Sequence, residues 1–220
     1  MIDTVLFDLD GTIIDTNELI ISSFQHVMGG WEHSAPWTRE QIIPHMGGTL
    51  EQQMRTFSGQ EEVSEYVKGY RAYNDIHHEA MVRPFPHVIE VVEALHQAGI
   101  VMGVVTTKIR PSTLKVLERF DLLKYMKTIV TVTDVTNPKP HAEPVLKAMT
   151  ELGADPAKTL MVGDSPVDIQ SAQNAGALSA GVAWSLKGET ILNGYGPDHM
   201  LHDMRDLLKL IRIETETGRS

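Results

Sequence analysis

The stretch "LFDLDGTIID" (residues 6–15) carries two aspartates inside an apolar run that breaks at Gly11. A short run of Leu, Phe and Ile that ends at a glycine is typical of a buried strand in a parallel sheet. Because side chains alternate between the two faces of a strand, residues two apart share one face and lie about 6.6 Å apart. Asp8 and Asp10 would therefore point into the same space. A buried strand has no structural need for these charges, so the pair indicates a chemical role.

Composition limits what that role can be. The chain has 220 residues and no cysteine, which excludes disulfides, thiolate nucleophiles and cysteine-ligated zinc and suits a reducing compartment. Its formal net charge of -10 disfavours nucleic acid and anionic membranes as partners. No apolar run approaches about 18 residues, and no basic segment precedes the first one, so we expect no membrane span, no signal peptide and a cytoplasmic location. The sequence leaves the oligomeric state open.

Short β-rich apolar runs alternate with amphipathic helical stretches from residue 99 to the end of the chain. This alternation is typical of an α/β fold. Besides residues 4–9, the runs expected to form strands are 100–105, 128–132, 159–163 and 177–183. Five parallel strands joined by helices predict a doubly wound, Rossmann-like sheet, whose ligands bind beyond the carboxyl ends of the strands.

Residues 16–82 contain no convincing strand, and their apolar residues recur at helical spacing. We expect an all-helical insertion here, between the first strand and the rest of the sheet. The part from Met28 to Gly48 is interrupted by glycines and prolines and is predicted to be rich in loops. His77 and His78 lack the further histidine that a zinc-binding helix needs and are expected on the surface.

Polar residues gather at the expected carboxyl ends of four strands. They are Asp8 and Asp10; Thr106, Thr107 and Lys108; Lys139; and Asp164 with Asp168. Crowded carboxylates repel one another unless a cation lies among them, and an all-oxygen site without His or Cys suits Mg²⁺. A hydroxyl, a lysine and backbone N–H groups can hold phosphate oxygens around such an ion. The set therefore predicts phosphoryl transfer, where positioning and charge neutralisation provide most of the catalysis.

Four motifs carry a family resemblance. "DLDGT" at 8–12, "GVVT" ending at 106, "PKP" at 138–140 and "VGDSPVD" at 162–168 match, in order and spacing, those of the haloacid dehalogenase superfamily. The helical stretch resembles the cap domain of its phosphoglycolate phosphatase-like branch. This implies a core of residues 1–15 and 83–220 and a cap of residues 16–82. "VTTK", "KPHAEPVLKA" and "AGVAWSLKG" look most similar to the PpaX-type inorganic pyrophosphatases.

The resemblance also implies roles for the residues of these motifs. Asp8 would attack phosphorus and form an aspartyl-phosphate, and Asp10 would act first as an acid and then as a base. Thr106 would bind a phosphoryl oxygen, and Lys139 would neutralise both Asp8 and the phosphoryl group.

A Mg²⁺ ion would be held by Asp8, the Asp10 carbonyl and Asp164. Asp168 and Ser165 would support this site from behind or through water.

The expected substrate is small and phosphorylated, with inorganic pyrophosphate first. The residues expected to contact it are Gly11, Thr107, Lys108, Arg71, His45 and Gly47. Three alternatives remain: a phosphatase of a small ester such as phosphoglycolate, a sugar phosphomutase, and a non-catalytic acidic pocket that accepts a phosphoryl group as a switch. Asp10 disfavours the switch because an acid at that position promotes hydrolysis.

Overall fold

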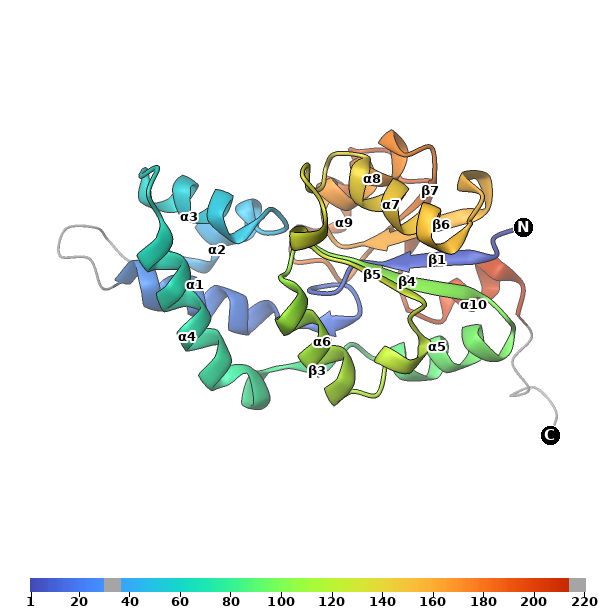
Figure 1. Cartoon of the computed structure of the whole chain (residues 1–220), viewed down its shortest axis with the longest axis horizontal. Helices are drawn as coiled ribbons and strands as arrows, with labels where there is room; N and C mark the ends of the chain where they lie inside the picture. The colour runs from blue at the N-terminus through green and yellow to red at the C-terminus, as the bar shows by residue number, and fades with distance from the viewer. Residues whose placement is uncertain (30–36, 214–220) are drawn as a thin grey trace.

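The computed structural model describes residues 1–29 and 37–213, which form a parallel sheet and an inserted group of helices (Figure 1). The sheet has six strands in the order β5-β4-β1-β6-β7-β8, and every neighbouring pair is parallel. The strands are β1 (Thr4–Phe7), β4 (Val101–Val105), β5 (Thr128–Val130), β6 (Thr159–Gly163), β7 (Leu178–Val182) and β8 (His199–Leu201). The chain thus builds outward from β1 through β4 and β5, and then returns to the other side of β1. Ligand sites of doubly wound sheets lie at such a reversal.

Helices cover both faces of the sheet (Figure 1). They are α5 (Val88–Gln97), α6 (Arg110–Arg119), α7 (Glu143–Leu152), α8 (Pro166–Asn174), α9 (Glu189–Asn193) and α10 (Asp206–Ile211). Val5 and Phe7 pack in the apolar cluster that contains residues of α5, α6 and α10. Leu6 packs in the cluster of α7 and α8 on the opposite face. This two-residue period explains why a strand covered on both faces reads as a continuous apolar run.

Four α-helices lie between residues 15 and 83 in the described part of the chain and form the insert on the left of Figure 1. They are α1 (Asn17–Gly29), α2 (Arg39–Ile42), α3 (Leu50–Ser58) and α4 (Ser64–Met81), with a 3-10 turn, η1 (Ile43–His45), after α2. They enclose an apolar cluster of their own around Phe24 and Phe57. A short antiparallel ribbon of β2 (Ile14–Asp15) and β3 (Arg83–Pro84) joins the insert to the sheet.

The five strands predicted from the sequence are confirmed, and the sixth was missed. β8 is a three-residue edge strand, "HML", without an apolar run of its own. The expectation of loop between Met28 and Gly48 is partly wrong because α2 forms there, capped at Thr38 by a reciprocal pair of hydrogen bonds with Gln41. Residues 30–36 of that stretch lie outside the described residues.

The expectation that His78 lies on the surface is also wrong. Its side chain is buried because the end of α4 packs beside α6, where Arg119 Nη1 donates to the His78 carbonyl oxygen at 3.2 Å. Neighbouring His77 is half-buried, with its ring against Tyr73. None of the described helices is both long enough and apolar enough to cross a lipid bilayer.

Candidate active site

Asp8 leaves the sheet at the carboxyl end of β1. Its backbone N–H donates to the Val162 carbonyl oxygen at 2.9 Å, so the pairing of β1 with β6 extends to this residue. Asp8 is only 7% exposed. A carboxylate this deeply buried requires a charged or hydrogen-bonding partner.

Lys139 provides that partner. Its Nζ atom donates to Asp8 Oδ1 at 2.8 Å, to the Val105 carbonyl oxygen at 2.9 Å and to Asp168 Oδ1 at 2.5 Å. These three acceptors match the three protons of an ammonium group. Desolvation would lower the pKa of Lys139, but the charges of Asp168 and Asp8 outweigh it and raise the pKa. Lys139 is therefore a permanent cation at the centre of the acidic cluster.

Asp168 and Ser165 form the N-terminal cap of α8. The backbone N–H of Ser165 donates to Asp168 Oδ2 at 3.0 Å, and the Ser165 side chain accepts from the backbone of Asp168. Asp168 thus has one carboxylate oxygen on Lys139 and the other on the helix cap. Both bonds hold its side chain in a fixed orientation behind Asp8.

Asp164 follows β6 and stands beside Asp8 at the same edge of the sheet. Ser185 Oγ donates to its backbone carbonyl oxygen at 2.6 Å, and no hydrogen bond within residues 1–29 and 37–213 reaches its carboxylate. The backbone of Gly11 packs directly against this carboxylate. A Cβ on Gly11, whose φ is +81°, would lie 2.7 Å from Asp164 Cγ. Glycine at this position therefore leaves space for the Asp164 side chain.

The three carboxylates fit a hard divalent cation. Asp8, Asp164 and Asp168 each offer an oxygen, and these oxygens lie within 4.8 Å of one another. Oxygen donors without nitrogen or sulfur are the set that Mg²⁺ or Ca²⁺ binds. Burial, together with repulsion from Asp168, raises the pKa of Asp8 to about 7 against the opposing effect of Lys139. Burial also raises the pKa of Asp164 well above its usual value, with Asp168 and Asp8 adding to the shift. A bound cation would relieve this repulsion.

Asp10 is paired with Lys108 on the open side of the cluster. Lys108 Nζ lies 3.1 Å from Asp10 Oδ2 and 3.3 Å from Oδ1. The backbone N–H of Lys108 donates to Thr106 Oγ1 at 3.1 Å, so the turn after β4 holds both residues in place. The polar residues predicted to follow β1, β4 and β6 therefore lie close together in the structure.

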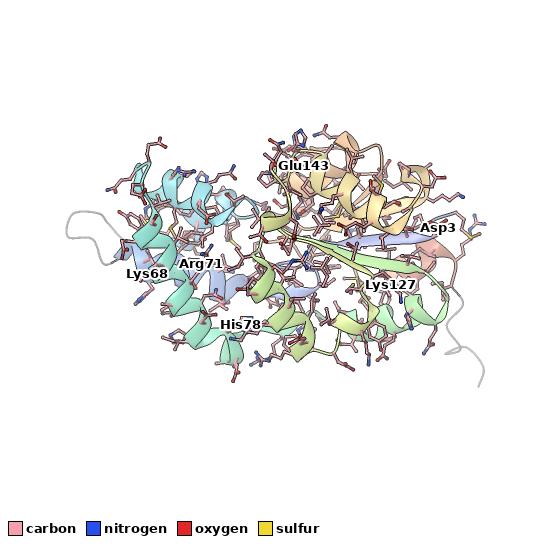
Figure 2. The ribbon with its side chains drawn as sticks, viewed as in Figure 1. Asp3, Lys68, Arg71, His78, Lys127 and Glu143 are labelled. Carbon is pink, nitrogen blue, oxygen red and sulfur yellow. The ribbon has the colours of Figure 1, made fainter. Side chains whose placement is uncertain are left out.

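A cavity of about 310 Å³ opens over these residues, between the sheet edge and the helical insert. The core contributes the residues expected from the motifs: Asp8, Asp10, Thr106, Thr107, Lys108, Asp164 and Asp168. The insert contributes Gly47 and Arg71, which were also expected, and Leu50 and Tyr70, which were not. Arg71 Nη2 lies 3.3 Å from Glu51 Oε1, and Figure 2 shows Arg71 on the part of α4 turned toward the core.

Further lining residues were missed by sequence reasoning. Asn74, Asp75 and Lys115 reach the same cavity. Helical spacing could have suggested Asn74, because residues 70, 71 and 74 share one face of a helix. Nothing local in the sequence marks Lys115, which lies on α6.

Two of the residues expected to contact substrate, His45 and Gly11, do not line this cavity. The His45 ring packs edge-on against Phe57 at 5.5 Å between centroids, and His45 is not among the cavity-lining residues. Gly47 touches the core directly: Thr107 Oγ1 donates to its carbonyl oxygen at 3.3 Å, and a Cβ would lie 2.9 Å from Ser165 Cβ. Gly47 therefore allows the edge of the insert to lie against the cap of α8.

Comparison with known proteins gives a consistent result. A family model described as haloacid dehalogenase-like hydrolase matches residues 5–182. A protein named pyrophosphatase PpaX from Anoxybacillus flavithermus is 42% identical over 212 residues, which cover 96% of this chain and 98% of the relative. One of the same name from Bacillus cereus is 44% identical over 212 residues, with 96% of each chain covered.

The fold agrees as well. The crystal structure of a haloacid dehalogenase-like hydrolase from Bacteroides fragilis superposes with a TM-score of 0.85 at 27% identity, covering 94% of this chain and all of that one. The motifs, the acidic cluster and these matches lead to one conclusion. The chain belongs to the haloacid dehalogenase-like hydrolases.

Proposed function

We propose that this protein is a Mg²⁺-dependent phosphohydrolase that acts through an aspartyl-phosphate and hydrolyses inorganic pyrophosphate to phosphate. The observation that carries the proposal is the geometry around Asp8. One of its oxygens is held by Lys139, and Asp164, whose carboxylate has no hydrogen bond in the described residues, lies beside it at the floor of a cavity.

In the proposed reaction, the Asp8 oxygen that is not bonded to Lys139 attacks phosphorus. The bond between phosphorus and the bridging oxygen breaks, and Asp10, protonated for this step, donates a proton to the departing phosphate. Asp10 then removes a proton from water, the water oxygen attacks phosphorus, and the bond to Asp8 breaks. Lys139 neutralises charge on Asp8 and on the phosphoryl group, and Thr106 binds a phosphoryl oxygen.

The proposed Mg²⁺ ligands are Asp8, Asp164 and the backbone carbonyl of Asp10, with Asp168 and Ser165 as support. When bound, Mg²⁺ would neutralise the phosphoryl oxygens and offset the repulsion between the carboxylates.

The groups proposed for the second phosphate come from both the cap, residues 16–82, and the core. Arg71 and Lys108 line the cavity and can move from their carboxylate partners to an anionic group. Gly47 and Thr107 are proposed to offer backbone N–H or hydroxyl groups to the substrate. His45 is left out of this set because its ring packs on Phe57. Gly11 is left out because its backbone N–H donates to the Ile14 carbonyl oxygen at 2.8 Å and it does not line the cavity. The pyrophosphatase names of the relatives at 42% and 44% identity support pyrophosphate as the substrate.

A second candidate is a phosphatase of a small organic ester. The apolar side chains of Leu50 and Tyr70 in the cavity wall favour it, because they could contact an organic group that pyrophosphate lacks.

Steady-state hydrolysis of pyrophosphate with Mg²⁺, measured against phosphoglycolate, sugar phosphates and an aryl phosphate, tests the proposal. We expect kcat/KM for pyrophosphate to exceed that for every ester by at least about 100-fold, equivalent to about 2.7 kcal/mol of transition-state stabilisation. An ester hydrolysed as efficiently as pyrophosphate would overturn this assignment in favour of the second candidate.

A further inference from the structure

The loop between β7 and α9, residues 183–188, belongs to the core and crosses to the insert. Lys187 Nζ donates to the carbonyl oxygens of Ile43 at 3.0 Å and Pro44 at 2.9 Å, both in η1 of the insert. A lysine that reaches two backbone carbonyls of another part of the fold forms charge-assisted hydrogen bonds, which are stronger than neutral ones.

An apolar contact accompanies these bonds. Leu186, from the same core loop, packs against the apolar cluster of the insert around Phe57 and Met54. Lys187 thus binds backbone carbonyls of the insert, and the neighbouring Leu186 packs on the apolar cluster of the insert.

The other side of this loop is bonded to the two segments that carry the catalytic acids. Ser185 Oγ donates to the Asp164 carbonyl oxygen at 2.6 Å and accepts from the Lys187 backbone N–H at 3.1 Å. Trp184 Nε1 donates to the carbonyl oxygen of Thr12, in the turn after Asp10, at 3.3 Å. Lys187 is therefore two hydrogen bonds away from the backbone of Asp164.

The surroundings of the Lys187 ammonium agree with a fixed rather than a solvated group. The side chain is half-buried, and its polar neighbours are the two η1 carbonyls and, at longer range, the carboxylates of Asp164 and Asp168. Burial lowers the pKa of Lys187, and the two carboxylates oppose that shift. The η1 carbonyls supply the hydrogen bonds that a half-buried ammonium group needs.

We propose that Lys187 is a positioning residue that fixes the 43–48 segment of the insert at a set distance from Asp164, with Ser185 as its anchor on the core. This segment carries Gly47, which forms part of the cavity wall and contacts Thr107. Lys187 is not among the residues that line the cavity, and it acts by placing the wall that faces the proposed metal ligands. Its kinetic consequence rests on the proposed pyrophosphatase function, whereas its structural consequence does not.

Amide hydrogen exchange in the absence of substrate tests the structural consequence. In Lys187→Met, we expect amides of residues 43–48 to exchange about tenfold or more faster than in the wild type, from the loss of two charge-assisted hydrogen bonds. Lys187→Arg, which keeps donors, is expected to restore much of the protection. Lys127→Met, at an exposed lysine labelled in Figure 2, is the matched control and should change nothing in this segment.

The anchor is tested by Ser185→Ala, a small deletion that leaves Lys187 intact. We expect faster exchange in residues 43–48 again, with a smaller increase than in Lys187→Met. In the kinetic assay, Lys187→Met should raise KM for pyrophosphate about tenfold while kcat at saturation changes less than about threefold.

Unchanged exchange in residues 43–48 of both Lys187→Met and Ser185→Ala would overturn the positioning role, even if the enzyme hydrolyses pyrophosphate. If no pyrophosphate is hydrolysed, the exchange result still decides the positioning role. If Lys187→Met does not fold, Ser185→Ala alone decides: unchanged exchange in its residues 43–48 would overturn the positioning role.

Discussion

Replacing Asp164 with Asn removes one charge from the acidic cluster and nearly preserves its shape. Oxygens of Asp8, Asp164 and Asp168 lie within 4.8 Å of one another. At that separation, two unit charges repel by about 3.5 kcal/mol at an effective dielectric constant of about 20. Lys139 offsets part of this repulsion, so we expect Asp164→Asn to stabilise the metal-free protein by roughly 1–3 kcal/mol at pH 8.

Mg²⁺ should stabilise the wild type more than the variant. A ligand at about 100 times its Kd stabilises the folded state by about 2.7 kcal/mol, which is about 5–11 °C in Tm for a chain of this size. We expect the wild type to gain this amount. Asp164→Asn should gain less than about 2 °C, because the variant lacks the Asp164 carboxylate, a proposed ligand of the ion.

Thermal unfolding with chelator and with Mg²⁺ measures both effects, and Asp121→Asn, at an exposed aspartate, serves as the control. The reasoning is refuted if metal-free Asp164→Asn melts below the wild type and Mg²⁺ stabilises both proteins equally.

Three further outcomes follow from the same contacts. Lys139→Met should destabilise the protein by about 3–5 kcal/mol in urea unfolding, because it leaves the buried carboxylates of Asp8 and Asp168 without their cation; an unchanged midpoint would contradict this. Gly11→Ala should abolish the Mg²⁺-induced rise in Tm, because its Cβ would displace Asp164; a retained rise would show that the site tolerates it. Burial raises the pKa of Asp8 in the metal-free protein from 3.8 to about 7. Protonation of Asp8 therefore stabilises the folded state fully below pH about 4, and this stabilisation is lost as pH rises through 7. Since Mg²⁺ must displace that proton, calorimetric Mg²⁺ affinity should fall up to about tenfold per pH unit below 7, and a pH-independent affinity would count against it.

Much of the candidate site was predictable because several of its residues directly follow strands that the sequence reveals. The register pairs Phe7 with Val104 on one side and with Val162 on the other, so residues that follow these strands meet at one edge. Sequence order and strand ends therefore place Asp8, Thr106 and Asp164 together without knowledge of the loops.

The cavity wall was less predictable because it depends on how the insert docks. Tyr70 reads as ordinary helix packing, and its position over the cavity follows from the contacts of α4 with α1 and α3. The expectation that His78 is exposed failed for a similar reason, since α6 covers it from outside the insert. Lys187 is an unmarked loop lysine in sequence, and its partners lie more than 140 residues away in the chain.

The most direct test of the account is a search for phosphate bonded to Asp8. The Asp10→Asn variant is mixed with pyrophosphate and Mg²⁺, quenched in acid within one turnover, digested and examined by mass spectrometry. We predict that the peptide containing Asp8 gains one phosphoryl group, and that Asp8→Asn neither gains it nor turns over. Retained turnover in Asp8→Asn, or product formation with no phosphoryl group on the protein at any time point, would contradict the central claim.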